Sequence, residues 1–92
     1  SWKFQEPEVK GNQATQKYNG IFNDGFAYQT YYLQLHHTQP GSGNTNAQQS
    51  GDVGGKICIG CGEKHVHVQI AGGDSSQSNV QWLDAAQYFC QK

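Results

Sequence analysis

The residues with the clearest chemical potential lie close together in the middle of the chain. Cys58 and Cys61 form a Cys-x-x-Cys pair, and His65 and His67 follow it. Thiolate and imidazole ligands suit a tetrahedral zinc site, and on a strand residues 65 and 67 point the same way. In an oxidising compartment, however, the thiols would form a disulfide before they bound metal. We therefore expect no metal or other cofactor, and keep a zinc-stabilised interaction module as an alternative, with Cys58, Cys61, His65 and His67 as its ligands.

The cysteine count indicates a single disulfide. Cys58, Cys61 and Cys90 are the only cysteines, and an odd number leaves one thiol over. We expect a bridge from Cys90 to Cys58 or Cys61, and adopt Cys58–Cys90, which ties the end of the chain to its middle. Closing a loop of about 30 residues stabilises a protein by roughly 3–4 kcal/mol on the chain-entropy model. The remaining thiol could link two copies into a dimer.

Composition and length bound the class of protein. The chain has 92 residues, which is enough for one small domain. Its net charge is −1, with six basic residues against seven acidic ones. This balance excludes polybasic binding to nucleic acid, and no apolar run approaches the roughly 18 residues of a membrane span. Because the sequence begins at Ser1 and contains no Met, we expect a processed, secreted protein.

Alternating apolar and polar residues predict about five strands. The first is expected to be an edge strand or a strand broken at a bulge, because Pro7 cannot donate to a ladder. Val9 lies on the opposite parity to Trp2 and Phe4, as a bulge would require. Asp24 and Gly25 lie between two aromatic-rich runs and predict a hairpin turn. The strands expected in this way span 2–10, 17–23, 26–37, 57–59 and 65–70.

The remaining segments decide between two fold classes. Residues 78–90 fit a helix of about three turns, although Val80 and Trp82 also alternate as they would in a strand. We expect an α+β class that is mostly antiparallel β with a C-terminal helix, and an all-β sandwich is the alternative. Residues 38–56 contain five Gly and almost nothing apolar. They predict a flexible loop inside a single domain that spans 1–92.

One strand of the predicted hairpin has an aromatic face that is suited to binding. Tyr28, Tyr32 and His36 share this face, opposite the face that turns to the core. Exposed Tyr gives a large contact area at low entropic cost, which favours a binding role. The alternative is that such rings only stabilise a thin sheet through cross-strand pairs. That alternative role is expected for the other aromatic residues near strands, Trp2, Phe4 and Phe22.

The segment HVHVQIA at 65–71 resembles the active-site line of the histidine-triad superfamily, in the branch related to galactose-1-phosphate uridylyltransferase. The shared pattern is His-φ-His-φ-Gln-φ-φ, where φ is apolar, and it covers seven residues. The resemblance implies a nucleotide-binding transferase or hydrolase. In it His67 would be the nucleophile, His65 would orient it and Gln69 would contact phosphate.

A looser resemblance covers more of the chain. The order of its short motifs is similar to the core of small fungal secreted ribonucleases, a fold on which plant-pathogen effectors are built. Gln16 and Leu33 stand where that family's catalytic His and Glu would be expected. A second fungal effector fold, a sandwich of two three-stranded sheets with one disulfide, is similar in strand count. Both imply a secreted protein, in the effector case translocated into a host, that binds a host protein or receptor and catalyses nothing. The motifs are QKYNGIF at 16–22, GF at 25–26, TYY at 30–32, SGDV at 50–53 and FC at 89–90.

Overall fold

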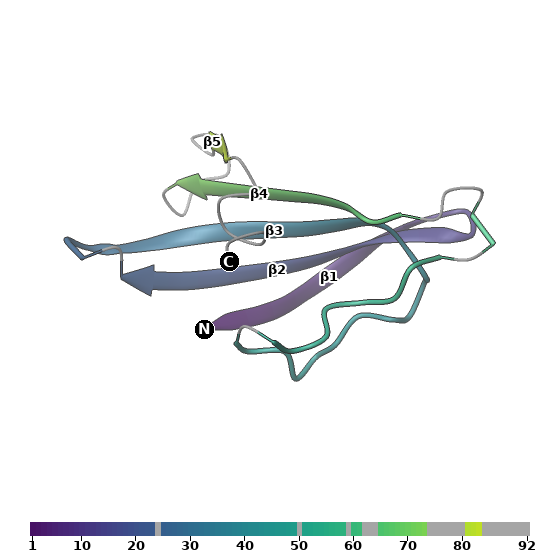
Figure 1. The fold of residues 1–92 in the computed structure, drawn as a ribbon, viewed down its shortest axis with the longest axis horizontal. Coiled ribbons are helices and arrows are strands. Elements are labelled where there is room, and N and C mark those ends of the chain that lie inside the picture. The colour runs from purple at the N-terminus through teal and green to yellow at the C-terminus, as the bar shows by residue number, and fades with distance from the viewer. Residues whose placement is uncertain (24, 50, 59, 62–64, 74–80, 84–92) are drawn as a thin grey trace.

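The chain folds around one antiparallel sheet (Figure 1). The computed structural model describes residues 1–92 except 24, 50, 59, 62–64, 74–80 and 84–92. Each strand pairs with its neighbour in sequence, so the order across the sheet is also the order along the chain. The described strands are β1 (Trp2–Lys10), β2 (Gln13–Asn23), β3 (Tyr28–Thr38), β4 (His67–Gly73) and the three-residue β5 (Gln81–Leu83).

The predominantly antiparallel β class is confirmed by the four strands β1–β4. The helix expected at 78–90 falls outside the described residues except for β5, whose backbone lies antiparallel beside β4. That helix and the total number of strands stay predictions. The described residues include no helix that is long and apolar enough to cross a membrane.

The strands themselves follow the alternation of the sequence. The bulge predicted at Pro7 is confirmed, because the register of β1 against β2 shifts between Gln5 and Glu8. The hairpin is also confirmed, but its last pair is Asn23 with Tyr28, so its turn is longer than the expected two residues. Of the strand expected at 57–59, the described residues show a single bridge that joins Ile57 to Thr38, and residue 59 lies outside them.

One face of the sheet carries the core. Tyr18, Leu33 and Ile70 come from adjacent strands and are buried there. Around them the aromatic rings meet edge to face, as in Trp2 against Phe22 (centroids 5.1 Å apart) and Phe4 against Tyr18 (5.3 Å). The aromatic residues near the strands therefore contribute cross-strand packing, the role that the sequence predicts for Trp2, Phe4 and Phe22.

The long loop between β3 and β4 covers this core. The described residues of 38–56 lie along the face of β1–β3, and the flexibility predicted for this segment stays a prediction. The hydroxyl of Tyr18 binds the loop on both its outgoing and its returning segment. It accepts from the amide of Asn44 (2.9 Å) and donates to the carbonyl oxygen of Gly54 (2.6 Å). Glycine permits the close approach, since a Cβ on Gly54 would lie 2.8 Å from Leu35 Cδ1. Ala47 is the one buried apolar residue that the described loop adds to the core.

Removing the Tyr18 hydroxyl should destabilise the fold. In Tyr18→Phe, the carbonyl of Gly54 and the amide of Asn44 lose their shared partner beside the core. We expect the free energy of unfolding, measured by urea denaturation, to fall by about 1–3 kcal/mol. The matched variant Tyr28→Phe removes a hydroxyl from a side chain that is 73% exposed, and should change stability by less than about 0.5 kcal/mol. Equal stabilities for the two variants would show that the hydroxyl does not hold the loop.

Candidate functional site

A bulge in β3 brings two adjacent histidines to the same face. Thr38 pairs with Ala14 and Leu35 pairs with Gln16, so His36 and His37 together stand opposite one residue of β2, Thr15. His37 has a φ of 61°, a left-handed conformation that costs a non-glycine residue about 1–2 kcal/mol. A bulge re-aims a side chain, and here the ring centroids of His36 and His37 lie 6.4 Å apart.

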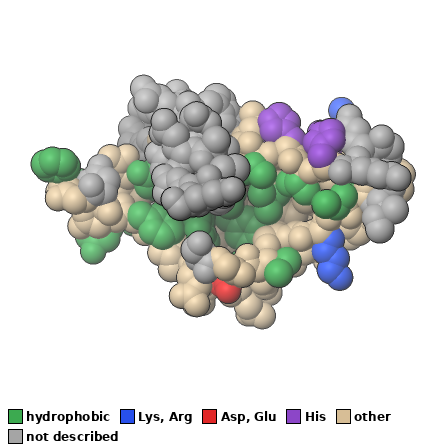
Figure 2. All heavy atoms as spheres, viewed as in Figure 1, with side chains coloured by type: hydrophobic (Ala, Val, Ile, Leu, Met, Phe, Trp, Pro, Cys, Tyr) green, Lys and Arg blue, Asp and Glu red, His purple; other side chains and the backbone are tan. Residues whose placement is uncertain are grey.

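The start of β4 adds two more histidines to this place. His67 pairs directly with His36 across the strands, and their ring centroids are 5.1 Å apart. His65 precedes β4, and its ring lies 5.3 Å from that of His37, which is itself 6.4 Å from His67. All four histidines of the chain therefore gather at one end of the sheet. We call His36, His37, His65 and His67 the histidine cluster, and Figure 2 shows histidine side chains exposed at this end of the molecule.

Hydrogen bonds hold the two histidines of β3. Thr15 Oγ1 lies 3.2 Å from His36 Nδ1, and Gln13 Oε1 lies 2.8 Å from His37 Nδ1. An amide oxygen only accepts, so His37 donates to Gln13 from Nδ1. His36 Nε2 is buried and has no hydrogen-bond partner among the described residues. His65 and His67, in contrast, are exposed.

Burial lowers the pKa of His36 below its ordinary value of 6.5. The nearby side chain of Gln69 works against this shift, whereas the neighbouring imidazoles of His67 and His37 add to it. Glu8, across the hollow, raises the pKa by a smaller amount. The environment of His36 therefore favours the neutral ring, because desolvation and like charges disfavour its protonated form.

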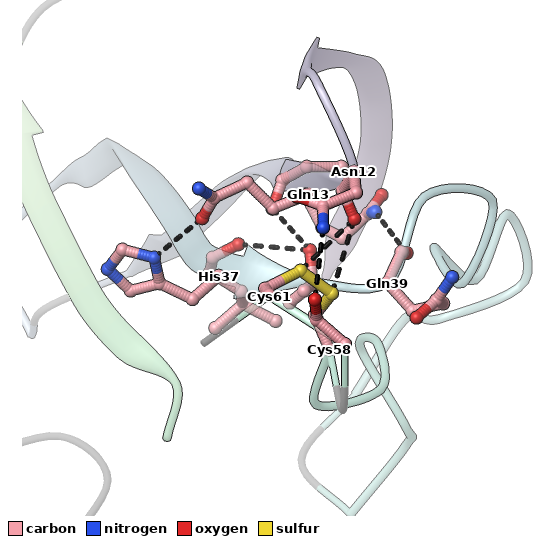
Figure 3. The surroundings of a disulfide bond; sticks show 11 residues. Asn12, Gln13, His37, Gln39, Cys58 and Cys61 are labelled. Atoms are coloured by element: carbon pink, nitrogen blue, oxygen red, sulfur yellow. Dashed lines mark hydrogen bonds between the residues drawn. A yellow bond between two sulfur atoms is a disulfide. The ribbon is translucent and has the colours of Figure 1, made fainter. Parts of the chain in front are cut away.

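The disulfide lies at the same end of the sheet and is local (Figure 3). Cys58 is joined to Cys61, with Cα atoms 5.5 Å apart. The bridge predicted from Cys90 to Cys58 or Cys61 is thus not the one in the structure, and Cys90 lies outside the described residues. A bridge between neighbours closes a much shorter loop than the one we expected, so its effect on the unfolded chain is smaller. With both sulfur atoms bonded, Cys58 and Cys61 are not available as the thiolate ligands of the predicted zinc site.

The disulfide turn is fastened to two parts of the sheet. Both sulfur atoms lie close to the carbonyl oxygen of Asn12, at 3.2 and 3.1 Å, and the Asn12 side-chain amide donates to Gly60 O at 3.0 Å. The amide of Cys58 donates to the carbonyl of His37 at 3.3 Å. The turn between β1 and β2, the bulged end of β3 and the disulfide are therefore one connected unit, which Figure 3 shows around His37 and Gln13.

The predicted binding residues share a face of β3 but do not form one patch. Tyr28 is 73% exposed at the hairpin end, Tyr32 is half-buried, and His36 lies in the histidine cluster. Eight residues of strand separate the first from the last, or about 27 Å. The sequence analysis missed Phe26 and Ile21, which are 99% and 58% exposed near Tyr28. The position of Phe26 directly after the turn glycine was the available signal for its exposure.

The three residues of the histidine-triad resemblance lie at and just before the start of β4, at the same end of the sheet as the histidine cluster. His67 and Gln69 alternate along β4, and His65 precedes them. The rings nearest to His67 are those of His36 and His37. The motif thus becomes part of a larger cluster of imidazoles, and its nucleotide chemistry stays a prediction.

Comparisons with known proteins find no relative. No family model, no curated protein and no solved structure matches this chain. The likenesses to fungal effectors and to the histidine-triad superfamily therefore stay predictions from short motifs.

The lowered pKa of His36 should make stability depend on pH. Because the folded pKa lies below the unfolded value, the contribution of His36 is fully present above about pH 6.5 and is lost as the pH falls through the folded pKa. We expect the urea midpoint to drop more between about pH 7.5 and 5.5 in the wild type than in His36→Gln. An NMR titration supplies the direct check, with the His36 ring titrating at lower pH in the folded chain than in urea. A folded titration midpoint equal to or above the unfolded one would contradict this.

The local disulfide predicts an order of thiol reactivity. After reduction under native conditions, Cys61 should react with iodoacetamide before Cys58, which is only 1% exposed. Reactivity requires access to the sulfur as well as thiolate character. Before reduction, a peptide that carries both residues should weigh two hydrogens less than its reduced form. A mass-mapped bridge to Cys90 would contradict the structure.

Proposed function

We propose that this chain is a small extracellular binding protein that engages a partner protein through the free end of the β2–β3 hairpin. The single observation behind the proposal is the exposure of three large apolar side chains there: Ile21, Phe26 and Tyr28. Exposed apolar groups that gather in one place are typical of interaction sites. Aromatic side chains such as Phe26 and Tyr28 are the kind that anchor protein interfaces.

The hairpin that carries these side chains packs against the core through its other face. On the core face, Phe22 packs against Trp2 and lies 6.1 Å from the ring of Tyr31. The turn is ordered by the side chain of Asn23, whose Oδ1 accepts from the amide of Gly25 at 2.8 Å. A hairpin whose strands are already paired loses less backbone entropy when it binds. A partner with an apolar cleft that accepts an aromatic ring fits this surface.

The location proposed for the protein is extracellular. The Cys58–Cys61 bridge supports it, since disulfides persist mainly in oxidising compartments. The effector-like role, in which the bound partner is a host protein or receptor, belongs to the same proposal. Its support is the small β scaffold and the exposed hairpin end.

Site-directed photo-crosslinking should place the partner at the hairpin end. With a benzophenone amino acid at position 26 or 28, incubation with cell-surface and tissue extracts should give one saturable crosslinked protein, identified by mass spectrometry. The matched position is Val53, which is 63% exposed on the covering loop and should not yield it. Excess unlabelled wild type and Val53→Ser should suppress the product, whereas Phe26→Ser should not.

Three results of the crosslinking would count against the proposed surface. They are equal yields from positions 26 and 53, no product at all, and a product that contains only a second copy of this chain.

A further inference from the structure

The covering loop and the core face of the sheet border a hollow of about 160 Å³. Its inner wall is apolar and buried, and is formed by Tyr18, Leu33 and Ala47. Trp2 also lines the hollow, and its backbone amide donates to the carbonyl of Gln48 in the loop at 2.9 Å (Figure 1). An apolar cavity of about 150 Å³ is large enough to hold benzene, so this hollow can take one ring or a group of similar size.

The mouth of the hollow is polar. Gln49, Gly51 and Asp52 line it and are exposed. The loop itself holds the carboxylate of Asp52 in place, because its Oδ2 accepts from the amides of Gln48 (2.8 Å) and Gln49 (3.1 Å). Within the described part of the chain its Oδ1 accepts no hydrogen bond, so one carboxylate oxygen is available to a ligand.

Asp52 keeps its negative charge at neutral pH. The backbone amides of Gln48 and, to a smaller extent, Gln49 lower the pKa of its carboxyl group below the ordinary value of 3.8. A carboxylate at the mouth attracts a cation, and the faces of aromatic rings, of which indole is the best, attract cations as well. The hollow thus brings together an apolar wall, the indole of Trp2 and one anionic group.

We propose that this hollow binds a small protonated amine that carries one apolar ring or a branched alkyl group. The apolar group enters between the sheet and the loop, and the ammonium group donates to Asp52 Oδ1 at the mouth. Among the described residues that line the hollow, Asp52 is the one charged group, so an anion of the same size is disfavoured. The site includes none of Ile21, Phe26 and Tyr28, and its test is therefore separate from that of the proposed function.

Benzylammonium chloride and benzyl alcohol are matched probes for this site, because they share the ring and differ in charge. In an NMR titration of the full oxidised chain at neutral pH, benzylammonium should shift the indole signal of Trp2 and the amide signals of Asp52 and Gly54. We expect a dissociation constant in the millimolar range, as is usual for so small a ligand. Benzyl alcohol should bind about fivefold more weakly, because it cannot form an ion pair with Asp52.

Two variants separate the contribution of the charge from that of the net charge of the chain. Asp52→Asn keeps an oxygen that can accept from the loop amides, so the variant should fold. It should weaken the binding of benzylammonium by about fivefold and leave the binding of benzyl alcohol unchanged. The matched control is Glu6→Gln, which removes a carboxylate from an exposed position of β1 outside the hollow, and it should bind both probes like the wild type.

A third variant tests whether the ring enters the hollow. Ala47→Val fills part of the space beside the inner wall and should weaken the binding of both probes alike, with the fold checked by its NMR spectrum. Unchanged binding in this variant would overturn the proposal. So would equal binding of the two probes by the wild type, an equal loss in Asp52→Asn and Glu6→Gln, or no shift of the Trp2 and Asp52 signals well above millimolar benzylammonium.

Discussion

The hydroxyl of Tyr18 is the contact on which the rest of the fold depends. Its ring fills the core between β1 and β3, and its oxygen binds both arms of the loop that closes that core. This loop contributes almost no apolar surface, since Ala47 is its one buried apolar side chain in the described part. Hydrophobic burial alone would therefore hold it weakly. Tyr18 adds two polar contacts to the loop, beside the hydrogen bond from the amide of Trp2 to the carbonyl of Gln48.

Because the polar loop covers one face of the sheet, the residues that point away from it determine the chemistry of the opposite face. Tyr18, Leu33 and Ile70 all turn toward the loop, so the alternate residues of the same strands face outward. The outer positions of β3 run from Tyr28, at the hairpin end, to His36, at the bulge. The two ends thus differ in chemistry: one presents apolar aromatic side chains and the other presents imidazoles. In the part of the chain that the structure describes, the sheet thus separates an exposed apolar surface from the histidine cluster by about the length of a strand.

The strands could be predicted from local sequence patterns. The packing of the loop and the histidine cluster depend on residues that are distant in the sequence. Pro7 predicted a bulge in an edge strand because it cannot donate to a ladder. The packing of the loop could not be predicted because a glycine-rich composition suits flexibility and close packing equally, and the packing depends on contacts such as that of Gly54 with Leu35. The histidine cluster was missed because the partner of His36 is set by the register of β4. The position of His37 depends in the same way on the bulge opposite Thr15. The disulfide was misassigned because the sequence does not tell which two of three cysteines approach.

The bulge, the disulfide and the histidines occur together because the chain crosses itself at this end of the sheet. The covering loop starts after Thr38 and returns at Ile57, where one bridge closes it. Directly beyond, the amide of Cys58 binds the carbonyl of His37, and Asn12 contacts both sulfur atoms. The disulfide thus fixes the positions of Cys58 and Cys61, which precede β4 in the chain. Among the described residues the buried apolar core is small, so the covalent cross-link at this crossing acts where packing contributes little.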